Sequence, residues 1–384
     1  MARWPMVALG EVAPLVRRSV EIDPDASYTE IGVRSFLKGI FHRRTLKGSE
    51  FDWQDLFRVR AGDLVVSNLM AWERAIGLAS DQDAGCVGNH RMLTCQPDHS
   101  RVVPGFLHYF FHVPTGYTQL ASASPGSIAR NKTLSASGLA AVRVPLPPLE
   151  EQRRIVARLD AVAARLKARA AAAESQEAEL AAMLQQAFAR ITASSPRARM
   201  ADVAPLVRRE VMIEPATLYT EIGIRSFYRG MFPRRTLAGA EFTWQSLYRI
   251  EPGDVVFSNL MAWEKGIALA GDADAGCVGN HRMLTCAPDH ARVLPGFLFF
   301  YFTTRQGFAK VEAASPGSIA RNKTLSPDGL AAIEVPLPPL EAQQWFEGLR
   351  LKANGLRALH AATAEDAAAL LPAMLYQSFS PAAC

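Results

Sequence analysis

The sequence predicts an α+β protein in which two copies of a mixed α/β domain alternate with two long helices. The first observation is an internal repeat without gaps, because Val12 matches Val203 and Pro145 matches Pro336 at a constant offset of 191 residues. Roughly two residues in three are identical between the copies, so the copies must share a fold. The second observation is that a helical segment follows each strand-rich segment. Each strand-rich segment has about 140 residues, which is the usual size of one domain.

Each copy contains strand signals followed by a helix signal. The segments GDLVVSNLMAW (62–72) and GDVVFSNLMAW (253–263) begin as strands, because apolar β-branched residues follow a Gly-Asp turn. The segment GNHRMLTC (88–95) has the period of two that is typical of a strand, and we predict it as one strand. The aromatic segments 104–113 and 295–304 each start at a proline and are predicted as buried helices.

The helical segment after the first copy, residues 151–191, contains no glycine or proline. Its apolar residues recur at four-three-four spacing, which predicts a helix of roughly 60 Å with an apolar seam. The second helix, 341–371, should be weaker, because Gly348 and Gly355 interrupt it and Pro372 ends it. The apolar residues of the two helices that we predict for helix packing and for binding partners are Ile155, Leu159, Val162, Leu166, Phe346, Leu349 and Leu356.

Neither long helix can bury its apolar stripe alone, so we expect the two to pack as an antiparallel coiled coil with pseudo-twofold symmetry. The predicted domains are 1–149 and 193–340 for the two mixed domains, 150–192 for the central helix and 341–384 for the C-terminal helix. Two similar domains held at a fixed distance suit a target that is itself repeated and inverted, such as duplex DNA.

Composition favours a soluble cytoplasmic protein, and the mildly basic charge is compatible with a polyanionic partner without indicating one. The net charge is +5 and the pI about 9.0, with 49% hydrophobic and 21% charged residues. No apolar run approaches the roughly 20 residues that span a bilayer, and the N-terminal residues lack the apolar core of a secretory signal. In a reducing compartment the five cysteines are expected to be free thiols.

The ten-residue segment SPGSIARNKT occurs twice, at 124–133 and at 315–324. It differs by one residue from a phosphate-binding P-loop, since Asn131 stands where the second glycine should be. The flanking pattern, a helix before the loop and only a short helix after it, disfavours a nucleotide site. The alternatives are a surface loop that caps a helix and a loop that donates hydrogen bonds to DNA phosphates or base edges. We favour the DNA-binding loop.

No pattern in the chain indicates catalysis. Cys86, His90, Cys95 and His99 are zinc-ligand types, but their spacing does not match common zinc motifs, so we assign no metal. We find no nucleophile elbow, no base for a cysteine nucleophile and no glycine-rich cofactor loop. The sequence therefore predicts a binding protein without catalytic residues or a cofactor of its own.

Basic and polar residues recur at matched positions and are predicted to contact DNA, against the alternative of a solvated charged face. The predicted pairs are Arg17 and Arg208, Arg18 and Arg209, Arg34 and Arg225, Lys38 and Arg229, Arg43 and Arg234, Arg44 and Arg235, His90 and His281, Arg91 and Arg282, and, in the repeated loop, Ser127, Arg130, Asn131, Lys132 and Thr133 with Ser318, Arg321, Asn322, Lys323 and Thr324.

The junction VPLPPLEEQRRIVARLD (144–160) resembles the boundary between target recognition domain and spacer helix in specificity subunits of type I restriction–modification enzymes. The second junction, VPLPPLEAQQWFEGL (335–349), is similar but departs after Gln343. The start of the chain, GDLVVSNLMAW and the loop before the proline stretch also resemble this family, and the likeness covers essentially the whole chain.

The resemblance implies a non-catalytic subunit whose two target recognition domains each read half of a split DNA site. It implies that the helices act as a ruler and as the dock for two modification subunits, which carry S-adenosylmethionine and methylate adenine. It also implies a motor–nuclease subunit, with ATP and Mg²⁺, as an optional further partner. Because the two copies are so similar, we predict two similar half-sites in inverted orientation, a near-palindrome with a nonspecific gap.

Three other classes of protein stay open on the sequence. One is the recognition subunit of another methylation or phage-defence assembly. A second is a duplicated scaffold that binds only proteins, for which the long helices would suffice. The third is an unrecognised zinc enzyme.

Overall fold

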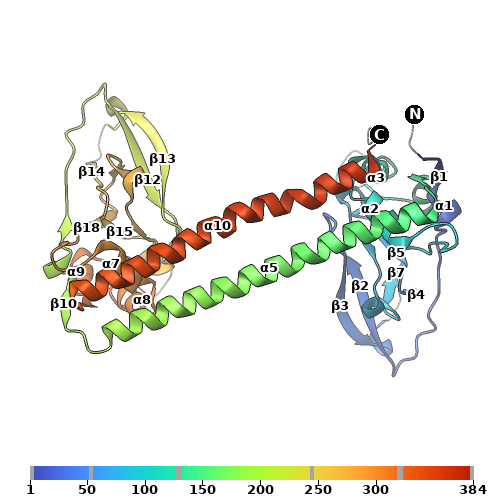
Figure 1. Ribbon diagram of the computed structural model, residues 1–384, viewed down its shortest axis with the longest axis horizontal. Coiled ribbons are helices and arrows are strands. Elements are labelled where there is room, and N and C mark those ends of the chain that lie inside the picture. The colour runs from blue at the N-terminus through green and yellow to red at the C-terminus, as the bar shows by residue number, and fades with distance from the viewer. Residues whose placement is uncertain (1–3, 52–54, 126–131, 243–245, 318–322, 381–384) are drawn as a thin grey trace. The chain divides into compact units, whose positions relative to one another are not determined.

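The computed structural model describes residues 4–51, 55–125, 132–242, 246–317 and 323–380 (Figure 1). The chain divides into two compact units: unit 1 is Met1–Ala172 with Ala361–Cys384, and unit 2 is Ala173–His360. Each unit therefore combines one mixed domain with the start of one long helix and the end of the other. The predicted α+β class is confirmed, and no helix among the described residues is long and apolar enough to cross a membrane.

Unit 1 contains a four-stranded sheet of order β3-β2-β7-β4, a three-stranded sheet of order β6-β5-β8 and the pair β1-β9. Its strands are β1 (Met6–Ala8), β2 (Ser27–Val33), β3 (Ile40–Lys47), β4 (Leu56–Arg58), β5 (Leu64–Ser67), β6 (Ile76–Leu78), β7 (Val87–Asn89), β8 (Met92–Cys95) and β9 (Arg143–Pro145). Its short helices are α1 (Leu9–Val12), α2 (Pro104–Phe110), α3 (Pro114–Ser122) and α4 (Ala136–Ala141), with 3₁₀ turns η1 (Gly48–Glu50), η2 (Ala71–Glu73) and η3 (Asp81–Asp83).

Unit 2 repeats this plan, with sheets of order β13-β12-β17-β14 and β11-β18-β15-β16 and the pair β10-β19. Its strands are β10 (Arg197–Arg199), β11 (Leu206–Val207), β12 (Leu218–Ile224), β13 (Met231–Ala238), β14 (Tyr248–Arg249), β15 (Val255–Ser258), β16 (Ile267–Leu269), β17 (Val278–Gly279), β18 (Met283–Cys286) and β19 (Glu334–Pro336). Its short helices are α6 (Met200–Val203), α7 (Pro295–Thr303), α8 (Arg305–Ala313) and α9 (Pro327–Ala331), with 3₁₀ turns η5 (Gly239–Glu241), η6 (Ala262–Glu264) and η7 (Asp272–Asp274).

The predicted strands at GDLVVS and GDVVFS and the two proline-started helices are confirmed as β5, β15, α2 and α7. The prediction of one continuous strand at 88–95 is wrong. The chain turns at His90 and Arg91 between β7 and β8, which lie in different sheets. The reason is local: the side-chain oxygen of Asn89 accepts a hydrogen bond from the amide of Arg91 at 3.0 Å, an Asx turn that competes with a continuous ladder.

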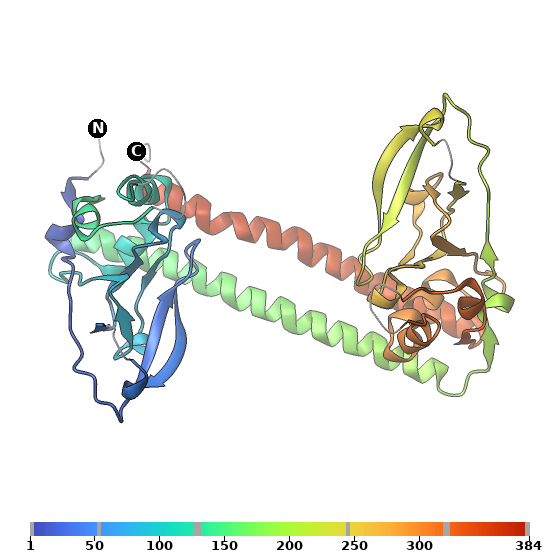
Figure 2. The ribbon, with the colours of Figure 1, turned by 180° about the vertical axis from the view of Figure 1, so that it is seen from behind.

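A long hairpin of β2 and β3 forms one side of the four-stranded sheet, with β3 at the edge (Figure 2). Its register shifts between Glu30 and Ile31, which is a β-bulge. At its tip two consecutive residues, Phe36 and Leu37, have φ angles of 58° and 61°. Left-handed backbone costs about 1–2 kcal/mol for each residue with a side chain, so surrounding contacts must hold this tip in place.

The long helices are α5 (Leu149–Thr192) and α10 (Leu340–Phe379). In unit 2 their chain directions are opposed, because the rings of Phe188 and Phe346 lie 5.2 Å apart and Arg357 bonds Glu177 at 2.8 Å. The predicted antiparallel packing is thus present there. In unit 1 the start of α5 and Leu375 of α10 share one core.

The predicted breaks in the second helix are wrong, because α10 continues through Gly348, Gly355 and Pro372. A glycine costs a helix only about 1 kcal/mol, which neighbouring packing can offset. Pro372 deprives the carbonyl of Ala368 of its donor, but Ala368 is exposed, so water can hydrate it. Beyond the proline, burial of Leu375 in the core of unit 1 favours further helix.

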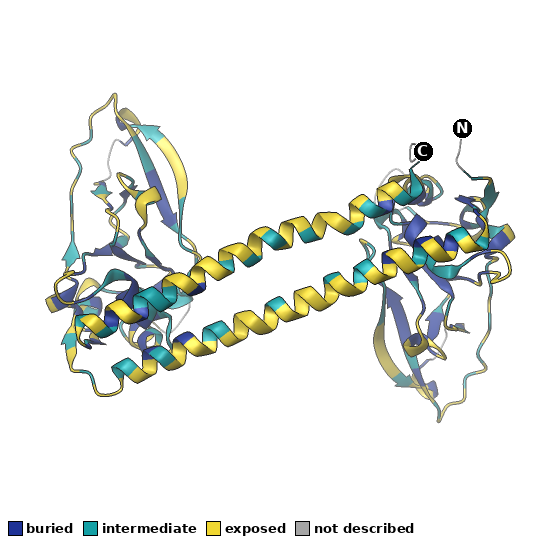
Figure 3. Ribbon diagram, viewed as in Figure 1, coloured by how far each residue is buried: buried dark blue, intermediate teal, exposed yellow. Residues whose placement is uncertain are grey.

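Both long helices bury their apolar residues near their ends, and their middle turns are exposed (Figure 3). No described residue of α5 between 160 and 179 is buried. The prediction that Ile155, Leu159 and Phe346 bind partners is corrected, because these side chains are buried in the cores of their own units, where Phe346 packs against Phe188 of α5. Leu349 packs at the margin of the unit 2 core, whereas Val162 and Leu166 are half-buried and Leu356 is exposed.

Candidate nucleic-acid interface

A buried glutamate organises the basic residues of the β2–β3 hairpin. Glu30 on β2 is 1% exposed, and its carboxylate accepts a hydrogen bond from Nε of Arg44 at 2.9 Å and lies 3.5 Å from Nη1 of Arg43. The amide nitrogen of Asn89 lies 3.4 Å from the same carboxylate. Both arginines stay about half exposed, so the glutamate holds one edge of each guanidinium group while other donors of that group can face water.

Unit 2 repeats this network at every position. Glu221 accepts from Nε of Arg235 at 2.6 Å, from the side chain of Asn280 at 3.1 Å, and lies 3.7 Å from Nη1 of Arg234. The structure therefore brings the predicted residues Arg43 and Arg44 together at one carboxylate, and brings Arg234 and Arg235 together at the matching one. The sequence analysis missed the glutamates and asparagines that hold them, although these residues are identical in the two copies.

The turn between β7 and β8 adds a second basic element beside the first. His90 and Arg91 are exposed there, and Asn89 links the turn to Glu30 of the hairpin. Arg17 donates to the carbonyl of His90 at 3.2 Å and lies over the ring of Phe57. In unit 2, His281 and Arg282 occupy the same turn, and Arg208 donates to the carbonyl of His281 at 3.2 Å.

Two predicted arginines have a structural role and leave the candidate set. Arg18 donates to both oxygens of Asp63, at 2.5 and 3.0 Å, and Asp63 is 2% exposed. Arg209 does the same with Asp254, at 2.6 and 3.1 Å. A bidentate pair with a buried carboxylate occupies the donors that a phosphate would need, and breaking it would leave a buried charge.

The repeated loop lies partly outside the described residues. Six of the predicted loop residues lie outside the described part of the chain: Ser127, Arg130, Asn131, Ser318, Arg321 and Asn322. Lys132 is described: its Nζ lies 5.1 Å from the ring centroid of Trp72, and Lys323 lies 5.8 Å from that of Trp263. Thr133 is exposed and Thr324 is half-buried.

The elements around this loop do not form a P-loop. Helix α3 precedes it, where a P-loop requires a strand, and the six-residue α4 follows. The amide of Leu134 donates to the carbonyl of Asn68 at 2.8 Å, which anchors the end of the loop on the segment that carries Trp72. The described end of the loop, from Lys132 to Leu134, therefore lies next to the segment that carries Trp72.

The hairpin tip carries the remaining predicted residues. Arg34 and Lys38 are exposed on either side of Phe36, and Arg34 also lies over the ring of Phe41 at 4.7 Å. In unit 2, Arg225 lies over the ring of Phe232 at 4.7 Å, and Arg229 over the ring of Phe227 at 5.8 Å. Stacking on the rings helps hold these guanidinium groups in place, and Nη1 of Arg225 also donates to the carbonyl of Met231 at 3.3 Å.

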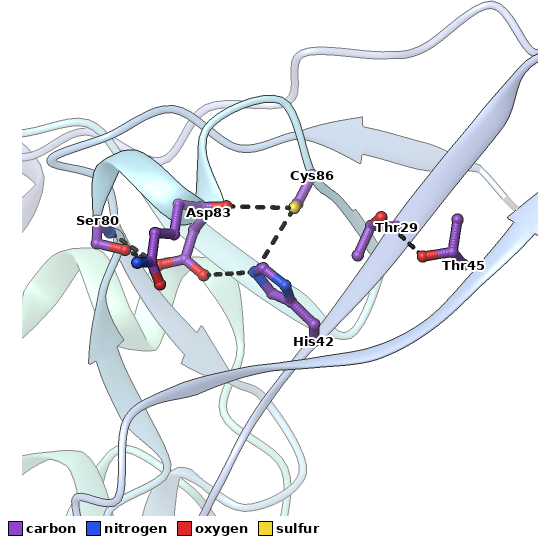
Figure 4. Close-up of polar contacts among 7 residues, drawn as sticks. Thr29, His42, Thr45, Ser80, Asp83 and Cys86 are labelled. Atoms are coloured by element: carbon purple, nitrogen blue, oxygen red, sulfur yellow. Dashed lines mark hydrogen bonds and ion pairs between the residues drawn. The ribbon is translucent and has the colours of Figure 1, made fainter.

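Unit 1 contains a contact between cysteine, histidine and aspartate side chains (Figure 4). Nε2 of His42 lies 3.0 Å from Oδ1 of Asp83 and 3.8 Å from Sγ of Cys86. Burial and the charge of Asp83 raise the pKa of Cys86. Burial alone would raise the pKa of Asp83, but hydrogen bonds from Ser80 and His42 outweigh it and lower that pKa.

This arrangement does not make a nucleophile. A reactive thiol needs a lowered pKa, and a relay through imidazole needs its two partners on different ring nitrogens, whereas here both share Nε2. The second copy has Pro233 in place of His42. The contact therefore ties β3 to the 80–86 segment in unit 1.

The four residues of the zinc alternative do not converge. Cys95 is buried in the core of unit 1, where burial and Asp63 raise its pKa to about 12, while His90 and His99 are exposed. Within the described residues no group of three or more His, Cys, Asp or Glu side chains is arranged to hold a metal ion.

The geometry defines a class: a duplicated binding protein, with one basic hairpin and one basic turn in each unit. Residues 1–174 match the family described as "Type I restriction modification DNA specificity domain". The match covers the first mixed domain, and the second mixed domain repeats that sequence at an offset of 191 residues. Residues 1–174 thus carry a type I restriction–modification DNA specificity domain by sequence.

Solved structures share the fold along the whole chain. The crystal structure of the HsdS subunit from Thermoanaerobacter tengcongensis is 19% identical with a TM-score of 0.57, over 98% of this chain and 96% of that one. A chain from a study of complex assembly and conformational transition of the type I R-M system is 19% identical with a TM-score of 0.66, over 98% and 97%. The type I S subunit from M. genitalium is 11% identical with a TM-score of 0.51, over 98% and 96%. Among curated protein sequences, none matches.

Proposed function

We propose that each mixed domain reads one half of a bipartite DNA site and that the two long helices set the spacing of the halves and dock two modification subunits. The observation that carries this proposal is the repeated network in which Glu30 holds Arg43 and Arg44 and Glu221 holds Arg234 and Arg235. Half-exposed arginines on a rigid strand are suited to phosphate and guanine contacts, which require a fixed fork of donors.

The two half-sites should be similar and inverted. The two mixed domains have the same glutamate and arginine pair on the hairpin, the same turn sequence Asn-His-Arg and the same ten-residue loop. Few differences on the hairpin could change the bases that one half-site requires. Examples are Ser27 against Leu218 and His42 against Pro233. We therefore expect a near-palindrome with a nonspecific gap, and two unrelated half-sites would contradict this.

The chemistry of modification would belong to the partners. In this proposal the modification subunits bind S-adenosylmethionine and methylate adenine, and an optional motor–nuclease subunit uses ATP and Mg²⁺. This chain would bind neither cofactor and would act in the cytoplasm on chromosomal and incoming DNA. The exposed middle turns of α5 and α10 are the surface that we propose for docking.

The test is a methylome of the source cell by long-read sequencing, with the gene intact and deleted. A split adenine-methylation motif that disappears on deletion supports the specificity role and reveals both half-sites. If every methylated motif survives deletion, this chain does not direct methylation. Filter binding of the complex with its modification subunits at two salt concentrations then separates a DNA reader, whose affinity falls with salt, from a scaffold that binds only proteins.

A further inference from the structure

The tip of the β2–β3 hairpin presents one aromatic side chain to solvent on a strained turn. Phe36 is 59% exposed although it is a large apolar residue, and the next residue, Leu37, packs on the core of unit 1. Both have positive φ angles. The left-handed pair points one side chain inward as an anchor and leaves the other outside.

The strained tip is held by four hydrogen bonds. The amides of Phe36 and Leu37 donate to the carbonyls of Glu73 and Arg74, at 2.8 and 3.1 Å, and the hydroxyl of Ser35 donates to the carboxylate of Glu73 at 2.8 Å. The fourth bond runs from the amide of Arg34 to the carbonyl of Gly39 within the hairpin. Strained residues persist only where the surroundings over-determine them, and they gather at functional sites.

Unit 2 has the same tip. Phe227 is 59% exposed, and its amide and that of Tyr228 donate to the carbonyls of Glu264 and Lys265, both at 3.0 Å. The anchor is stronger there, because the hydroxyl of Tyr228 donates to the carbonyl of Phe302 at 2.8 Å. An exposed phenylalanine in the same strained geometry, in two copies that differ at many other positions, indicates a contact that both units make alike.

The charge around each ring indicates what covers it. Beside Phe36 stand the exposed Arg34 and Lys38, and the guanidinium of Arg74 lies 5.9 Å from the ring centroid. The carboxylate of Glu73 also lies at this tip, where it accepts a hydrogen bond from the hydroxyl of Ser35. The tip therefore carries three positive charges and one carboxylate that already accepts a hydrogen bond. This excess of positive charge suits a polyanionic partner better than an apolar protein surface.

We propose that Phe36 and Phe227 contact the faces of DNA bases as apolar wedges, one in each half-site, while the flanking cations bind the phosphates on either side. Apolar side chains that wedge between base steps and aromatic rings that stack on bases are established modes of DNA binding. The inference rests on the proposed DNA-reading function. It adds a contact that is not electrostatic and that would be the same in both units.

The test uses the full chain assembled with its modification subunits and a duplex of about 60 base pairs that carries the methylated motif. Phe36→Ala and Phe227→Ala should each weaken binding roughly 5- to 150-fold, the range expected when one base stack is removed. The slope of log affinity against log salt should not change, because the cations that neutralise the phosphates remain in place. Phe36→Trp, which keeps an aromatic ring, should keep most of the affinity.

The matched control is the pair Lys38→Ala and Arg229→Ala, which should flatten the salt slope instead. Unchanged affinity of both phenylalanine variants, with wild-type chain binding the duplex, would overturn the wedge but leave the proposed function intact. If the wild-type complex does not bind the duplex at all, the proposed function fails and the wedge with it. Loss of assembly with the modification subunits, at unchanged DNA affinity of the assembled fraction, would show that the phenylalanines bind protein.

Discussion

Glu30 and Arg44 form a hydrogen-bonded ion pair at 2.9 Å in which the carboxylate is buried and the guanidinium is half exposed. The pair joins the two strands of the hairpin beside its bulge. Such a contact costs desolvation of the acid, but it fixes the direction of the arginine before any ligand arrives. The same pair recurs between Glu221 and Arg235.

We predict that Glu30→Gln weakens DNA binding and destabilises unit 1, because the arginines lose the charge that holds them. The loss of hydrogen bonds to a charged group should lower the free energy of unfolding by about 1–3 kcal/mol. Glu221→Gln should do the same in unit 2. Denaturant titration and filter binding measure the two effects. Glu150→Gln, which removes an exposed surface pair, is the control and should change neither. Equal DNA affinity of Glu30→Gln and wild type would refute the positioning role.

Lys132 and Lys323 should contact phosphates from their positions over Trp72 and Trp263. The double variant Lys132→Ala, Lys323→Ala should weaken binding of all DNA sequences alike and reduce the salt slope by about 2, because each lysine that neutralises a phosphate accounts for roughly one unit. Binding isotherms at three or more salt concentrations measure this slope. A change in sequence preference, with the slope intact, would instead assign these lysines to base reading.

Unit 1 also has two half-buried imidazoles, His108 and His112, at positions where unit 2 has none. Nε2 of His108 lies 3.2 Å from Nε2 of His112, and Nδ1 of His108 has no hydrogen-bond partner among the described residues. Burial lowers the pKa of His108 to about 4, against the opposing charge of Asp160. Burial, then His108 and Arg74, lower the pKa of His112 to about 3. The counterparts in unit 2 are Phe299 and Thr303.

We therefore predict that unit 1 loses stability in mild acid while unit 2 does not. The folded pKa values lie below the usual 6.5, so the unfolded chain takes up protons first as the pH falls. The contribution is complete above about pH 6.5 and is lost progressively toward pH 3, by on the order of 2 kcal/mol for each imidazole between pH 7 and 5. Calorimetry of the full chain at both pH values measures it. The variant His108→Phe, His112→Thr, which copies unit 2, should abolish the difference, and an acid-sensitive variant would contradict the assignment.

Several features of this protein follow from the sequence alone, because they depend on near neighbours and on the repeat. The offset of 191 residues requires two like units, and the spacing of Ile155 and Leu159 requires a helix with an apolar face. The strands after each Gly-Asp turn and the proline-started helices are equally local. The DNA-binding expectation came from residues that recur at matched positions, together with the resemblance to the specificity family.

Only the tertiary structure separated arginines that look alike in the sequence. Arg18 meets the buried Asp63, 45 residues away, and becomes structural, while Arg44 meets Glu30 and keeps half of its surface in water. Pro372 stays inside a helix because Leu375 beyond it is buried in a core formed mainly by residues of the first half of the chain. Partners so distant meet only when the chain folds, and burial decides which polar groups remain free to bind. That is why the repeat and the local patterns determined the fold, while packing decided which arginines keep donors free for a ligand.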